Sequence, residues 1–148
     1  MEPVLDSARL AISGEAMGAM EFLNRQTLDY LKTRKQFGTT IGTFQALQHR
    51  MVDCFAACEN TRSLLYRALC TAEAGDPDAG RSLLALKVMV GRAGRQIGNE
   101  AIQMHGGMGM TTELAVGHYV KRLMLINTLF GDADYHQQRL IELVNQAA

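Results

Sequence analysis

Apolar residues recur at helical spacing along most of the chain, and this pattern predicts three long helices in its first 105 residues. The first covers residues 4–33, and Pro3 suits its first turn. The second covers residues 44–73. The third follows Pro77, and its buried side is predicted to carry Leu86, Val90, Ala93, Ile97, Ala101 and Met104.

Two shorter helices are predicted after these. Thr111 or Thr112 can cap a fourth helix that ends near residue 125, and Asp132 can cap a last helix that ends near residue 145. Glycine-bearing segments at 38–42, 74–80 and 106–109 read as connectors. No segment alternates with period two, so we predict no β-sheet. The expected fold is an all-α, antiparallel bundle of long helices, forming one domain over residues 1–148.

The charge balance narrows the classes of partner. The 148 residues include 15 basic and 15 acidic side chains, so no net field favours a nucleic acid or an anionic membrane. No apolar run approaches the ~20 residues of a membrane span, and Asp6, Arg9 and Glu15 interrupt any signal peptide. Three cysteines without a CxxC pair indicate reduced thiols. We therefore expect a soluble, cytoplasmic protein.

The stretch QMHGGMGMTTE, residues 103–113, contains three glycines between two predicted helices. It is not a dinucleotide-binding GxGxxG loop, and a helix rather than a strand precedes it. Gly106 can end the helix, but this leaves Gly107 and Gly109 unexplained. They fit either a plain connector or bare backbone lying against a phosphate-bearing ligand. Arg34 ends the first helix, and the connectors 38–42 and 106–109 can fall at the same end of the bundle, so one site could use both.

Two long segments resemble a known family. YLKTRKQFGTTIGTFQALQHRMVD, residues 30–53, is similar to the RxxFGxxIxxFQxxQ segment of acyl-CoA dehydrogenases, and AIQMHGGMGMTTELAVGHYVKR, residues 101–122, is similar to their QxxGGxG segment. The resemblance covers nearly the whole chain. It corresponds to the C-terminal, all-helical domain of these flavoproteins.

The resemblance implies an FAD site that is shared across a subunit interface. The residues expected to contact FAD are Arg34, Gln36, Phe37, Gln45, Gln103, Met104, His105, Gly106 and Gly107. A guanidinium suits pyrophosphate oxygens, and glycine lets backbone donors come close. The implied reaction is α,β-dehydrogenation of an acyl-CoA thioester, with an electron-acceptor flavoprotein as a further partner. A homodimer, homotetramer or hetero-oligomer is expected, since a monomer would supply part of the site.

The family's catalytic glutamate has no counterpart at either of its usual positions. These positions hold Gly131 and Ala8 here, so Asp132 is the candidate base, although an aspartate at a helix start is more often a cap. DADYH groups Asp132 with Asp134 and His136, but a single cluster cannot close a metal site, and we predict no metal.

The missing glutamate leaves other functions open. The family places a helical domain and a β-domain before this bundle, so we expect the isolated chain to be inactive alone. It could also belong to a non-catalytic FAD-binding partner subunit, or be a plain helical assembly module.

Overall fold

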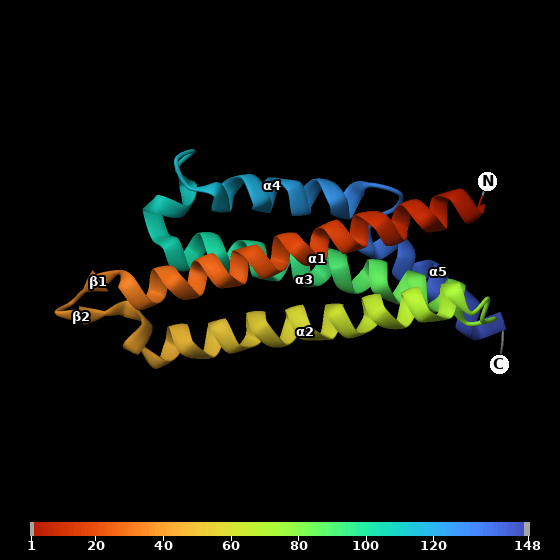
Figure 1. Cartoon of the computed structure of the whole chain (residues 1–148), viewed down its shortest axis with the longest axis horizontal. Helices are drawn as coiled ribbons and strands as arrows, with labels where there is room; N and C mark the ends of the chain where they lie inside the picture. The colour runs from red at the N-terminus through yellow and green to blue at the C-terminus, as the bar shows by residue number, and fades with distance from the viewer. Residues whose placement is uncertain (1, 147–148) are drawn as a thin grey trace.

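The computed structural model describes residues 2–146, which form long helices packed side by side (Figure 1). In chain order the elements are α1 (Glu2–Thr33), β1 (Lys35–Gln36), β2 (Thr39–Thr40), the 3-10 turn η1 (Ile41–Thr43), α2 (Gln45–Glu73), α3 (Ala79–His105), the 3-10 turn η2 (Gly106–Met110), α4 (Ala115–Thr128) and α5 (Ala133–Gln146). The predicted all-helical bundle is therefore confirmed, and the long helices lie close to their predicted positions.

α3 is the centre of the bundle and packs against each of the other four α-helices. All six positions predicted for its buried side are buried: Leu86, Val90, Ala93, Ile97, Ala101 and Met104. α4 lies close to α3 where the bare backbone of Gly94 and Gly98 faces Leu123 and Val120. The core is thus continuous along α3, with side chains of α1 and α2 on its other sides.

Two sequence predictions are wrong. Residues 35–40 form a small antiparallel hairpin, although no sheet was expected. The fourth helix is not capped by a threonine, because α4 starts at Ala115 after Leu114, which makes no side-chain cap. The Thr111 hydroxyl instead donates to the Met108 carbonyl at 2.9 Å. The glycine segment continues as η2, residues 111–114 form bends, and α-helix resumes at residue 115. The prediction for Asp132 is confirmed, since its Oδ1 accepts a hydrogen bond from the Tyr135 N–H at 2.8 Å.

The arrangement places the two glycine-bearing connectors at one end. The β1–β2 hairpin and η2 lie at the same end of the bundle, while the start of α1, the end of α5 and the turn between α4 and α5 lie toward the other (Figure 1). Within residues 2–146, no helix combines the length and the apolar character needed to cross a membrane.

Candidate functional site

The hairpin after α1 turns through two residues with positive φ. Phe37 has φ 56° and Gly38 has φ 80°, and Gln36 pairs with Thr39 across them. Positive φ at both central residues defines a type I′ turn, whose twist matches that of a hairpin. Glycine adopts this conformation readily, but phenylalanine does so rarely. The turn leaves Phe37 88% exposed, with an edge-on contact to Phe44 at 6.1 Å between ring centroids.

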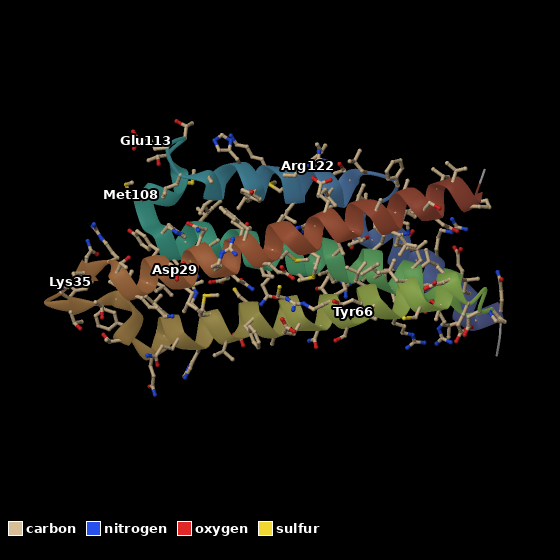
Figure 2. The ribbon with its side chains drawn as sticks, viewed as in Figure 1. Asp29, Lys35, Tyr66, Met108, Glu113 and Arg122 are labelled. Carbon is tan, nitrogen blue, oxygen red and sulfur yellow. The ribbon has the colours of Figure 1, made fainter. Side chains whose placement is uncertain are left out.

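A groove of about 520 Å³ lies between this hairpin, the start of α2, the end of α3 and η2. Figure 2 shows Lys35 of the hairpin and Met108 of η2 at this end of the bundle. The groove is lined by Tyr30, Arg34, Gln36, Phe37, Ile41, Phe44, Leu47, Arg50, Gln103, Met104, His105, Gly106, Gly107 and Met108. The structure therefore brings together the predicted cofactor-binding residues of both motifs. Gln45 is the exception, since it is exposed at the start of α2 and does not line the groove.

The two arginines of the groove differ in their charge partners. Arg50 forms an ion pair with Glu100 of α3, with 2.5 Å between Nε and Oε2. The Arg34 guanidinium is exposed and makes no hydrogen bond or ion pair with any residue in 2–146. Arg34 therefore offers an uncompensated positive charge and its full set of donors to an anion in the groove.

An aromatic pair forms one wall of the groove. His105 is buried, and its Nδ1 donates to the Ala101 carbonyl at 2.7 Å. This bond fixes the ring orientation and leaves Nε2 as the other polar atom. The Tyr30 ring lies against it with 4.5 Å between centroids. The His105 side chain is thus held in place by α3 itself and by α1.

The glycines of the η2 segment have different local roles. Gly106, with φ 61°, ends α3, and its N–H donates to the Gln103 carbonyl. Gly109 lies against α3, where a Cβ would be 2.7 Å from the Ile102 carbonyl oxygen. A Cβ at Gly107 would meet no heavy atom within 4 Å, and its φ is not positive. The fold therefore does not require glycine at 107, which leaves close approach by a ligand as a reason for it.

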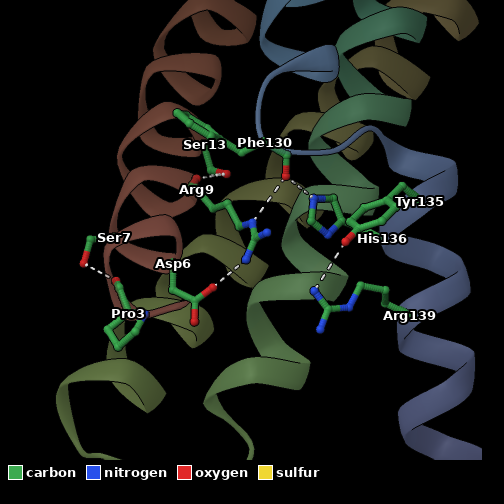
Figure 3. A network of polar contacts seen from close by, with 9 residues as sticks. All are labelled: Pro3, Asp6, Ser7, Arg9, Ser13, Phe130, Tyr135, His136 and Arg139. Carbon is green, nitrogen blue, oxygen red and sulfur yellow. Dashed lines mark hydrogen bonds and ion pairs between the residues drawn. The ribbon is translucent and has the colours of Figure 1, made fainter. Parts of the chain in front are cut away.

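The turn between α4 and α5, where Asp132 lies, is held by buried basic side chains (Figure 3). The Phe130 carbonyl accepts hydrogen bonds from Arg9 Nε at 3.3 Å and from His136 Nε2 at 3.0 Å. Arg9 also pairs with Asp6 at 2.7 Å. His136 is fully buried, and its Nδ1 has no hydrogen-bond partner in the described chain. Burial lowers the pKa of His136, so the ring is neutral at neutral pH.

Lys87 of α3 extends this cluster beneath the same turn. Its Nζ donates to the carbonyls of Ile126 at 3.1 Å and Leu129 at 3.0 Å, and the residue is 1% exposed. Burial, together with the nearby charge of Arg9, lowers the pKa of Lys87 to about 8, against a smaller opposing effect of Asp132. Three basic side chains from α1, α3 and α5 thus converge on the last carbonyls of α4 and its turn.

The two positions at which the sequence resemblance predicts a catalytic glutamate are Gly131 and Ala8. Gly131 has φ 98°, and a Cβ there would lie 2.6 Å from the Tyr135 ring and 2.7 Å from His136 Nε2. A side chain at this position would be strained by the backbone conformation and would have to displace the Tyr135 or His136 ring. Ala8 is half-buried on α1, next to Arg9. The space beside Gly131 is thus closed by the Tyr135 and His136 rings.

Asp132 lies at the edge of a polar cavity of about 320 Å³ between α3 and the α4–α5 turn. Asp132 is exposed, and one of its carboxylate oxygens already accepts the capping hydrogen bond at the start of α5. The cavity is lined by Gly91, Arg92, Arg95, Gln96, Asn99, Asn127, Asp132, Ala133 and Asp134. The cap role of Asp132 is therefore established by geometry, while a role as base stays a prediction. Among residues 2–146, no group of three His, Cys, Asp or Glu side chains is placed to hold a metal ion.

Sequence reasoning missed Arg9, Lys87 and His136 as a cluster. One signal for it was present, because Lys87 follows Leu86 and precedes Val90 by three residues on the apolar face of α3. A lysine at such a position is buried and must find carbonyl or carboxylate partners.

Comparison with known proteins supports the sequence motifs. The family model "Acyl-CoA dehydrogenase, C-terminal domain" matches residues 1–144. The chain is 34% identical over 117 residues to the probable acyl-CoA dehydrogenase FadE25 of Mycobacterium tuberculosis, a match that covers 79% of this chain and 30% of that relative. Two solved structures are similar: PigA with FAD and proline (28% identity, TM-score 0.91, covering 97% of this chain and 37% of that one), and the ChsE4-ChsE5 complex from Mycobacterium tuberculosis (25% identity, TM-score 0.90, covering 95% and 38%).

Proposed function

Because the chain belongs to the acyl-CoA dehydrogenase family, we propose that its bundle supplies part of an FAD site in a flavoprotein that oxidises acyl-CoA thioesters. The observation that carries this proposal is the groove itself. Segments about 70 residues apart in the sequence meet there, and an unpaired arginine, an exposed aromatic ring and an unconstrained glycine line it.

The groove residues suit a dinucleotide chemically. Arg34 would bind the pyrophosphate with two parallel N–H donors. Gly107 would let a backbone donor approach the same oxygens, and Phe37 would offer its ring face to a flat group. FAD, when bound, supplies the hydride acceptor for α,β-dehydrogenation. The similar structure of PigA was solved with FAD and proline, which supports the choice of cofactor.

The groove is open to solvent, so other surfaces must complete the site. Phe37 projects outward with 88% of its surface exposed, and the chain spans 30% of the length of its curated relative. A second subunit, or the domains that this family places before the bundle, would cover the rest of the cofactor. Acyl-CoA would bind in the completed protein, and reducing equivalents would pass to an electron-acceptor flavoprotein.

The test is FAD binding by the full-length protein with Arg34 changed. Arg34→Ala is expected to weaken FAD binding by about 30-fold, since a charge-assisted hydrogen bond contributes roughly 2 kcal/mol. Lys35→Ala is the matched control, because Lys35 is an exposed neighbour that does not line the groove. Titration of apoprotein with FAD would measure both. Equal affinities for wild type and Arg34→Ala would overturn the proposal.

A second candidate function, that of a non-catalytic partner subunit, is favoured by a separate observation. The closed position at Gly131 favours a partner subunit that holds FAD but leaves proton abstraction to another chain. Asp132→Asn separates the two, because asparagine also caps a helix and therefore preserves the fold while removing the carboxylate. Anaerobic bleaching of the flavin by acyl-CoA would be lost in this variant if Asp132 is the base. Unchanged bleaching would exclude Asp132, and no bleaching even in wild type would favour the partner subunit.

A further inference from the structure

The end of the bundle away from the FAD groove holds a small basic pocket. Its volume is about 320 Å³, and it lies where α2, the start of α3 and α5 meet. Figure 1 shows the turn between α2 and α3 and the end of α5 at this end, opposite the β1–β2 hairpin. We call this site the α3 pocket, and it is lined by Leu64, Arg67, Arg81, Ser82, Ala85 and Leu140.

The α3 pocket contains a buried hydroxyl without a partner. Ser82 is 3% exposed, and its Oγ has no hydrogen-bond partner in residues 2–146. The other three serines of the chain each donate to the carbonyl four residues earlier, those of Pro3, Arg9 and Glu59. A buried hydroxyl that makes no hydrogen bond is unfavourable. The exception at Ser82 therefore points to an acceptor that a ligand brings.

Two arginines give the α3 pocket its charge. Arg67 of α2 and Arg81 of α3 are exposed, and neither guanidinium makes a hydrogen bond or ion pair with another residue of the described chain. No carboxylate is among the lining residues. The nearby turn carries Asp76 and Asp78, but Asp76 Oδ1 already accepts the Asp78 N–H at 2.7 Å. The pocket therefore offers two uncompensated cations to an anion.

The N-terminus of α3 adds a further positive contribution. This helix is 27 residues long and begins at Ala79, so Ser82 follows at the end of its first turn. Asp78 makes no side-chain cap, and the N–H groups of Gly80 and Arg81 have no acceptor within residues 2–146. The dipole of a long helix favours an anion at this end.

We propose that the α3 pocket binds a small phosphate monoester. Its three terminal oxygens can accept hydrogen bonds from Arg67, Arg81 and the Ser82 hydroxyl, and its double negative charge matches the two arginines. The aliphatic side chains of the lining cover the organic part of the ester. The volume lies at the lower end of the range for ligand pockets, which suits a small ligand. None of these residues lines the FAD groove, so the inference does not rest on the proposed function.

The test is calorimetric titration of the full-length protein with n-butyl phosphate in the presence of excess FAD. Excess FAD occupies any phosphate site in the groove, so binding of one equivalent per chain reports on the α3 pocket. Inorganic phosphate is expected to bind about 10-fold more weakly, because it leaves the apolar walls uncovered. The result does not require that FAD bind, so failure of the proposed function would leave this titration interpretable.

Ser82→Ala is the most specific variant. It should weaken binding of n-butyl phosphate by about 10-fold. The thermal stability of the unliganded protein should not fall, because the Ser82 hydroxyl has no partner to lose. Ser63→Ala is the matched control, since the Ser63 hydroxyl donates to the Glu59 carbonyl on the exposed side of α2 and lies outside the pocket. It should leave the affinity unchanged.

The two arginines are tested in the same titration. Arg67→Gln and Arg81→Gln should each weaken binding by about 30-fold. Arg25→Gln removes an exposed arginine of α1 that does not line the pocket, and should have no effect. Absence of n-butyl phosphate binding in wild type would overturn the proposal. So would an unchanged affinity in Ser82→Ala or in either pocket arginine variant, an equal loss in Arg25→Gln, or equal affinities for inorganic phosphate and the ester.

Discussion

The chain turns twice through a phenylalanine and a glycine that both have positive φ, at Phe37–Gly38 and at Phe130–Gly131. The two phenylalanines are the non-glycine residues of positive φ in residues 2–146, with φ 56° and 58°. Their surroundings differ. The first turn is exposed and lies beside the groove, whereas the second is fixed by buried donors beneath the start of α5.

The difference shows two ways in which a strained turn persists. At Phe130 the carbonyl accepts two hydrogen bonds from Arg9 and His136, which offset a strain of about 1–3 kcal/mol. At Phe37 the ring contact with Phe44 is the compensating interaction within the chain. The first turn thus holds the Phe37 ring in solvent beside the groove, whereas the second holds the Phe130 carbonyl against buried donors. One end of the bundle gathers the groove residues, while the other is packed around the buried side chains of Arg9, Lys87 and His136.

The largest expected effect comes from filling the closed turn. Gly131→Ala places a Cβ 2.6 Å from the Tyr135 ring at a φ of 98°, and should lower the free energy of unfolding by about 3–4 kcal/mol. Gly14→Ala is the control, because a Cβ there meets no heavy atom within 4 Å in the middle of α1. This control should gain up to about 1 kcal/mol. Urea denaturation measures both, and a loss of less than 1 kcal/mol in Gly131→Ala would contradict the closed geometry.

A somewhat smaller effect should depend on pH through Lys87. Its pKa is about 8 in the folded state and 10.5 in the ordinary, unfolded one. Between these values the unfolded chain binds more protons, so the free energy of unfolding rises with pH, by roughly 3 kcal/mol in total. Lys87→Met should lack this rise. Urea denaturation of both proteins from pH 7.5 to 10.5 measures the difference.

Wild type and Lys87→Met share the other groups that titrate in this pH range, so their difference isolates Lys87. Burial raises the pKa of Cys54 to about 12, which lowers the free energy of unfolding above pH 9 in both proteins alike. Subtracting the variant from wild type removes that contribution. If the two curves stay parallel over the whole range, the Lys87 ammonium is not buried as the structure has it.

The helices were predictable because their signals are local. The apolar spacing of α3 places all six expected side chains in the core, and Asp132 marks the start of α5 by an ordinary cap. The hairpin was not predictable in this way, because its two-residue turn holds Phe37 in place of the asparagine or aspartate that usually signals a type I′ turn. The start of α4 was missed for a related reason, since Leu114 precedes it without a capping side chain.

The residues of the groove were predictable where they belong to one of the two sequence motifs. Arg34 and Gly107 lie more than 70 positions apart in the sequence, and helix lengths alone allowed their connectors to meet at one end of the bundle. The basic cluster beneath the other turn depends on tertiary packing. Arg9 reaches across 121 positions to the Phe130 carbonyl, and no local pattern encodes a contact of that range.

The smallest effect distinguishes the two turns directly. Phe37→Asn forms the Asn-Gly pair that type I′ turns prefer, and should raise the free energy of unfolding by about 1 kcal/mol while weakening FAD binding. Phe130→Asn relieves the same strain but removes a ring that is 40% exposed against 88% for Phe37, so it should bring no gain. Thermal unfolding and FAD titration measure the two variants side by side. A gain at Phe37 with unchanged FAD affinity would mean that its exposed ring presents nothing to the cofactor, and an equal gain at both positions would remove the distinction between the turns.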